Sequence, residues 1–200
     1  MKFTKILILI GALAIVFGGS AFLYNYLSAN NEPSTPTTSI EITVDADSAK
    51  EGIEVGNKAY DFTLSTYDGE EVSLSDFQGK IVILNFWASW CGPCQLEMPG
   101  FQAIQDKLTA LGPAADAVFL TVNLADGSRE TRDIAKAFLD KTGYTFPVVY
   151  DDNKGEIANL YQIYSIPSTY VIDKDGIIDK MFLGATSQSD LESAIEDARS

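Results

Sequence analysis

The stretch Trp90-Cys91-Gly92-Pro93-Cys94 constrains this 200-residue chain most, because it contains both of the chain's cysteines, separated by two residues. The apolar run from Ile81 to Trp87 precedes it and is typical of a buried strand. The segment from Gln95 to Leu111 follows it and is predicted to be a helix, which Gly112 and Pro113 end. The sequence therefore predicts two thiols at a turn between a buried strand and a helix.

Two thiols in this position suit disulfide exchange, in which only a thiolate attacks. Cys91 is expected near the helix N-terminus, where unpaired N–H groups and the helix dipole favour negative charge and lower a thiol pKa. Cys94 lies about one turn further into the helix, where it is more shielded. The pattern predicts Cys91 as the nucleophile and Cys94 as the resolving thiol.

The residues beside the thiols suit contact with a polypeptide substrate. Gly92 lets a substrate backbone approach closely. Pro93 fits the first helical turn, where its missing N–H is not needed. Trp90 is expected on the substrate-facing rim, whereas Trp87 is expected in the core.

Structural roles for the two cysteines compete with this interpretation. A disulfide across so short a loop stabilises only weakly. A zinc site needs four Cys or His ligands, and the chain has no His and no further Cys, so only a site shared between chains would remain.

The lack of His also excludes Cys–His and Ser–His catalytic pairs, and no phosphate or dinucleotide motif occurs. We expect a redox-active disulfide, no metal and no cofactor.

The segments around the dithiol resemble the thioredoxin superfamily. VILNFWASWCGPCQLEMPGF, followed far downstream by IYSIPSTYVIDKDG, is similar to the membrane-anchored, extracytoplasmic branch typified by the TlpA and ResA proteins. The resemblance runs from about Ile53 to the C-terminus. It implies a thioredoxin-like α/β fold, a mixed central sheet flanked by helices, with an N-terminal β-hairpin and a central strand–helix insertion from Val118 to about Tyr150.

The resemblance also implies roles for individual residues. Pro167 matches the family's cis-proline, which faces the dithiol and helps to bind the extended substrate, and Ile166 would present its backbone to that substrate. Glu97 matches an acidic residue that this branch carries after its cysteines. A partly buried carboxyl group there would have a raised pKa and could relay a proton, although a solvated helix acid is the alternative. Because Asn85 stands where ordinary thioredoxins carry a buried Asp, acid–base work is expected to fall on Glu97 or on water.

The remaining elements alternate between strands and helices before a final hairpin, as a mixed sheet with helices on both faces requires. The prediction comprises a hairpin around Asp68-Gly69, a strand at Val118–Val122, a helix at Ser128–Lys141, an extended piece at Phe146–Val149, a short helix at Gly155–Tyr161, an antiparallel pair at Thr169–Ile172 and Ile177–Leu183, and a helix that Ser187 caps and that runs to about Ala198.

The N-terminus predicts a membrane anchor. Ile6 to Leu27 contains no charged residue and is long enough to span about 30 Å of hydrocarbon. Lys2 and Lys5 precede it and acids follow it, which places the N-terminus inside and the rest outside. Gly19-Ser20-Ala21 could instead be a signal-peptide cleavage site, but the apolar run continues past it, so we favour an uncleaved anchor.

The chain is therefore predicted to consist of three segments and to be located at the cell membrane. Residues 1–27 form a cytoplasmic stub and anchor, 28–52 a flexible extracytoplasmic tether, and 53–200 a thioredoxin-like domain. The protein would be a single-pass protein of the cell membrane with its C-terminal domain outside. The formal net charge of −14 disfavours nucleic acid as a partner.

These observations predict a thiol–disulfide oxidoreductase, more specifically a reductase of disulfides in exported client proteins, with apocytochrome c as the first candidate. A dithiol kept reduced outside the cell needs a membrane electron donor with a dithiol of its own. A thiol oxidant or isomerase is the rival within the class, and the reduction potential separates them.

A Cu(I)-binding chaperone is an alternative of a different class, but it would be expected to supply a His as well. A peroxiredoxin-type peroxidase would need a Thr/Ser-rich turn and a nearby Arg, which do not accompany Cys91 in the sequence.

Overall fold

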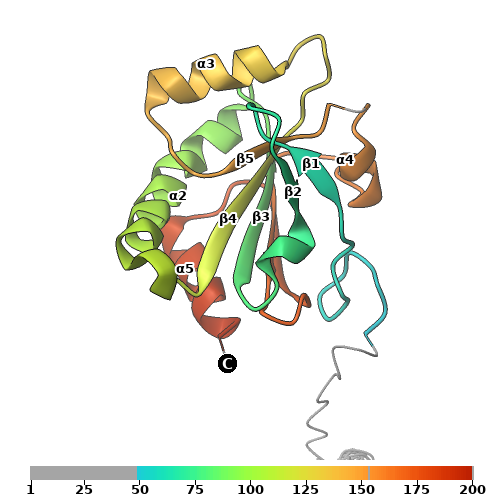
Figure 1. The fold of residues 1–200 in the computed structure, drawn as a ribbon, viewed down its shortest axis with the longest axis vertical. Coiled ribbons are helices and arrows are strands. Elements are labelled where there is room, and N and C mark those ends of the chain that lie inside the picture. Colours follow the sequence, from blue (N-terminus) through green and yellow to red (C-terminus); the bar gives the residue numbers. More distant parts are fainter. Residues whose placement is uncertain (1–48, 153, 200) are drawn as a thin grey trace, which may run out of the picture. The chain divides into compact units, whose positions relative to one another are not determined.

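The computed structural model describes residues 49–152 and 154–199, which form a seven-stranded sheet with helices on both faces (Figure 1). The strands are β1 (Thr63–Ser65), β2 (Glu71–Ser73), β3 (Ile81–Trp87), β4 (Ala117–Asn123), β5 (Val148–Tyr150), β6 (Ser168–Ile172) and β7 (Ile178–Leu183). The helices are α2 (Gly92–Leu111), α3 (Arg132–Thr142), α4 (Glu156–Leu160) and α5 (Gln188–Asp197), with the 3-10 turns η1 (Leu74–Phe77) and η2 (Gly112–Ala114).

The sheet is mixed, and β3 lies near its middle in the order β2-β1-β5-β4-β3-β6-β7. β3 pairs in parallel with β4 and antiparallel with β6. All seven of its residues are buried, because helices and loops cover both faces of the sheet. The unbroken apolar run that predicted this strand is therefore explained by burial on two sides.

Two cores lie on the two faces of the sheet, and alternate residues of β3 belong to each. Ile83 and Trp87 join the core formed with α2, α3 and α5. Leu84 and Phe86 join the other core, which includes Ile157 of α4 and residues beside the N-terminal hairpin. Figure 1 shows α2 and α5 next to each other on their side of the sheet. The dithiol helix is thus fixed by a large packed surface.

The structure confirms the predicted thioredoxin-like fold, including its N-terminal hairpin and its strand–helix insertion. β1 and β2 pair antiparallel around Asp68-Gly69, and β6 and β7 pair antiparallel near the C-terminus. β4 and α3 form the insertion, followed by β5, which pairs in parallel with β4. Ser187 caps α5 as predicted, since its hydroxyl accepts the Asp190 N–H at 3.1 Å.

Two helix starts differ from the prediction. α2 begins at Gly92, three residues before Gln95, because Cys91 itself is the N-cap residue. α3 begins at Arg132 instead of Ser128, because Thr131 is its N-cap and accepts the Ile134 N–H at 3.2 Å. The polar residues before Thr131 form a loop, which becomes important at the site described below.

The predicted anchor and nearly all of the predicted tether lie outside the described residues. Within residues 49–152 and 154–199, none of the helices has the length and apolar character needed to cross a bilayer.

Candidate active site

Cys91 and Cys94 form a disulfide at the point where the chain passes from β3 into α2. The S–S distance is 2.10 Å and the Cα atoms are 5.3 Å apart. Cys91 is the N-cap residue of α2, and its Sγ accepts the backbone N–H of Cys94 at 3.2 Å. The sulfur of Cys91 therefore lies where unpaired helix N–H groups favour negative charge.

The two sulfurs differ in their access to solvent. Cys94 is fully buried, whereas Cys91 retains 4% exposure. The surrounding rim is open, because Gly92 and Pro93 are exposed and Trp90 is 41% exposed. Cys91 is thus the sulfur that an incoming partner meets first.

The loop before β6 faces the dithiol. The Ile166–Pro167 peptide bond is cis, as the resemblance implies. The carbonyl oxygen of Ile166 lies 3.7 Å from Cys91 Sγ, although the two residues are 75 positions apart. Pro167 is buried and its carbonyl accepts the N–H of Gly184 at 2.8 Å, which ties this loop to the end of β7. The structure therefore brings together the two segments that carry the resemblance.

Glu97 lies in α2 below the dithiol and is only 4% exposed. Its Oε1 accepts a hydrogen bond from Asn85 Nδ2 at 3.1 Å, and its Oε2 accepts the N–H of Thr186 at 3.1 Å. Asn85 also donates to Thr169 Oγ1 at 2.9 Å. Burial raises the pKa of Glu97 to about 7, and the two hydrogen bonds oppose this rise. Glu97 is therefore a buried acid and not a solvated helix residue.

A second buried carboxyl group, which the sequence did not predict, contacts the turn that leads to the dithiol. Glu130 comes from the loop between β4 and α3, is fully buried, and accepts hydrogen bonds from Ser89. Ser89 lies two residues before Cys91. No local pattern marks this contact, because it joins positions 41 residues apart and depends on the path of the loop.

The same loop places a cation against the rim. The guanidinium carbon of Arg129 lies 3.5 Å from the centre of the Trp90 ring, which is a cation–π contact. The sequence did not predict this arginine beside Trp90, the residue that precedes Cys91. Arg129 comes from the same loop as Glu130, so this loop contacts the turn that carries Trp90 at two places.

The model of the AhpC/TSA family matches residues 55–181, the part that carries the sheet and the dithiol. The chain belongs to the AhpC/TSA family. The chain is similar to YneN, a thioredoxin-like protein of Bacillus subtilis, with 37% identity over 145 residues that make up 72% of this chain and 81% of YneN. It is 40% identical over 147 residues to the thiol-disulfide oxidoreductase ResA of Oceanobacillus iheyensis, which covers 72% of each chain.

Solved structures agree with this assignment. A crystal structure from Chlorobium tepidum, provisionally named as the thiol:disulfide interchange protein DsbE, superposes with a TM-score of 0.64 at 32% identity. The match covers 74% of this chain and 100% of that one. The AhpC/TSA assignment thus rests on the sequence match, and the thioredoxin-like fold rests on both sequence and structure.

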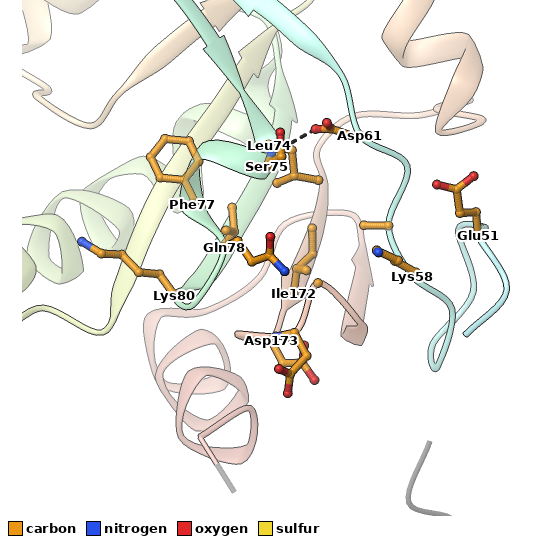
Figure 2. Close-up of a pocket in the computed structure, with 14 residues that line it drawn as sticks. Glu51, Lys58, Asp61, Leu74, Ser75, Phe77, Gln78, Lys80, Ile172 and Asp173 are labelled. Carbon is orange, nitrogen blue, oxygen red and sulfur yellow. Dashed lines mark hydrogen bonds between the residues drawn. The ribbon is translucent and has the colours of Figure 1, made fainter. Parts of the chain in front are cut away.

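A separate cavity of about 200 Å³ lies at the other end of the sheet in this AhpC/TSA chain. Figure 2 shows its apolar side chains, among them Leu74 and Ile172, together with the charged groups of Lys58, Lys80 and Asp173. Lys80 directly precedes β3, whereas the dithiol follows the end of that strand, so this cavity is not part of the dithiol site. Among the described residues no group of three or more His, Cys, Asp or Glu side chains could hold a metal ion.

Proposed function

We propose that this thiol–disulfide oxidoreductase reduces disulfides in exported proteins, with apocytochrome c as the first candidate client. The observation that carries the proposal is the Cys91–Cys94 disulfide at the N-terminus of α2, opposite the cis bond before Pro167. The kinship with ResA, a thiol-disulfide oxidoreductase, supports the class of reaction. The direction of electron flow is our inference.

The reaction begins with both cysteines reduced. The Cys91 thiolate attacks one sulfur of the client disulfide, and the other client sulfur leaves as a thiolate that takes up a proton. Cys94 loses its proton and attacks Cys91 Sγ, which breaks the mixed disulfide and releases the second client thiol. Two electrons have then passed to the client, and the chain holds the Cys91–Cys94 disulfide that the structure contains.

The geometry supports this assignment of roles. Cys91 has the greater exposure and accepts an N–H group from the helix, both of which suit an attacking thiolate. Cys94 is buried and bonded to Cys91, so it is placed to attack that sulfur and no external one. We assign Glu97, one turn beyond Cys94 with a pKa near 7, as the group that exchanges the proton.

The exposed rim would hold the client. The Ile166 carbonyl lies beside Cys91 Sγ and is placed to accept a hydrogen bond from an extended client backbone. Trp90 offers an exposed aromatic surface, and Gly92 with Pro93 leaves space for the client chain next to the sulfur. We assign these four residues, together with Pro167, to client binding.

We further propose that residues 6–27 anchor the chain in the cell membrane, that residues 28–52 act as a tether, and that the domain from residue 53 lies outside. The uncharged apolar run after Lys2 and Lys5 supports this orientation. A membrane protein with a dithiol would then return the Cys91–Cys94 disulfide to its reduced form.

Trapping of clients tests the proposal. In cells that carry Cys94→Ala, exported proteins should remain attached to Cys91 as mixed disulfides, because the resolving thiol is missing. The matched variant Cys91→Ala should trap none. Equal trapping by both variants would contradict the assigned roles.

The reduction potential tests the direction. A value near that of thioredoxin, about −270 mV, or lower is expected for a reductase. A value near that of a strong oxidant, about −120 mV, would favour the oxidant alternative.

A further inference from the structure

The loop between β4 and α3 holds the turn from which the dithiol helix starts. Glu130 Oε1 accepts the backbone N–H of Ser89 at 2.8 Å, and Oε2 accepts the Ser89 hydroxyl at 2.6 Å. Oε1 also accepts the side-chain amide of Asn123 at 2.8 Å, at the end of β4. One carboxyl group thus joins the β4 end to the β3–α2 turn through three hydrogen bonds.

These bonds are strong constraints because Glu130 is fully buried. A buried carboxyl group needs hydrogen-bond partners, and removing it would leave the Ser89 and Asn123 donors unsatisfied in the interior. Ser89 is also held from the helix side, since its carbonyl accepts Gln95 Nε2 at 2.6 Å. The peptide groups on both sides of Ser89 are therefore fixed.

The position of Cys91 follows from this turn. The chain has only Trp90 between Ser89 and Cys91, and the Cys91 N–H is bonded to the Ala88 carbonyl at 3.1 Å. Cys91 must keep its extended backbone for its sulfur to reach the Cys94 N–H. A displacement of about 1 Å at a reacting group can cost about a hundredfold in rate.

We propose that Glu130 is a positioning residue for disulfide exchange, which acts through Ser89 to hold the Cys91 sulfur at the N-terminus of α2 and opposite Ile166. This inference rests on the proposed function, because it concerns the rate of the same reaction. Glu130 acts in this role only through its hydrogen bonds within the chain. Its neighbour Arg129 covers Trp90, so the same loop supports both residues that precede Cys91.

Three variants of the full-length chain separate positioning from simple stabilisation. Glu130→Ala removes all three bonds. Glu130→Gln can keep them, because its amide oxygen can accept from Ser89 and Asn123 while its amide group donates to the Ser89 hydroxyl. Asp151→Ala is the matched control, since Asp151 is also a buried carboxyl group but accepts the N–H of Ala158 in α4 at 2.7 Å.

Two measurements are made on each variant: the rate of insulin reduction with dithiothreitol as electron donor, and the pH dependence of Cys91 alkylation by iodoacetamide. Glu130→Ala should slow insulin reduction by at least about tenfold, and its alkylation profile should move to higher pH as the sulfur leaves the helix N-terminus. Glu130→Gln should stay within about threefold of the wild type, and Asp151→Ala should keep the wild-type alkylation profile.

An unchanged alkylation profile in Glu130→Ala, or the same shift in Asp151→Ala, would overturn the inference. If Glu130→Ala does not fold, the variant Ser89→Ala replaces it, because it loses only the hydroxyl bond. Its alkylation profile should move to higher pH by a smaller amount. An unchanged profile in Ser89→Ala would contradict the inference. A wild-type chain that fails to reduce insulin would instead refute the proposed function, so the two failures are distinguishable.

Discussion

Glu97 illustrates how burial sets the chemistry of a single residue. Its pKa rises from the ordinary 4.5 to about 7, chiefly because burial disfavours the charged form. Between pH 4.5 and about pH 7, Glu97 is protonated in the folded chain and ionised in the unfolded chain. The free energy of unfolding should therefore fall as the pH rises through this window, by up to roughly 3 kcal/mol, and should level off above it.

The variant Glu97→Gln cannot titrate and should lose this part of the pH dependence. We expect the free energy of unfolding of the oxidised variant to vary less between about pH 5 and pH 8 than that of the wild type. Denaturant titrations of the oxidised proteins measure it, because the disulfide prevents the thiols from titrating. Parallel profiles for the two proteins would mean that Glu97 reaches solvent. In the reduced chain the same substitution should alter the pH dependence of the thiols.

Helix α5 is held against α2 by buried side chains, and Ser187 caps its N-terminus. Leu191, Ala194 and Ile195 of α5 are buried in the core that also contains the dithiol. Ser187→Ala removes the hydroxyl that accepts the Asp190 N–H, and should lower the free energy of unfolding by about 1 kcal/mol. Urea denaturation measures the loss.

The same variant should leave the insulin reductase activity unchanged, because Ser187 lies outside the dithiol turn. Ser193→Ala, at an exposed position further along the same helix, is a suitable control for loss of a hydroxyl group. A stability equal to that of the wild type would show that the cap contributes nothing here.

The elements also show what the sequence could and could not reveal. β3 was predictable with its bounds, because burial on both faces demands an unbroken apolar run. The dithiol and Glu97 were predictable, since they are close along one helix. Glu130 and Arg129 were not, because their contacts depend on a loop whose path only the folded sheet defines. That loop was assigned to α3, whose true start at Thr131 depends on a cap that a polar stretch does not distinguish.

For the whole molecule, the strongly acidic charge should influence which clients approach fastest. The formal net charge is −14, so a basic disulfide-containing peptide should be attracted and an acidic one repelled. We expect the ratio of kcat/KM for a basic over an acidic peptide of matched length to exceed one at low salt. The ratio should move toward one as salt is added to about 1 M, where screening is nearly complete. A ratio that does not respond to salt would show that local contacts alone decide the preference.

The first described residues and the dithiol lie at opposite ends of the sheet, and this arrangement affects how other molecules reach the dithiol. The first described residues join the sheet beside Ile177 and Ile178, at the end where β3 begins, and Glu51 there lines the charged cavity. Cys91 and Cys94 lie at the opposite end, beyond Trp87. The described part of the chain therefore begins at the end of the sheet that is opposite the dithiol. Under the proposed function, the electron donor and the client would therefore both reach Cys91 without meeting the first described residues.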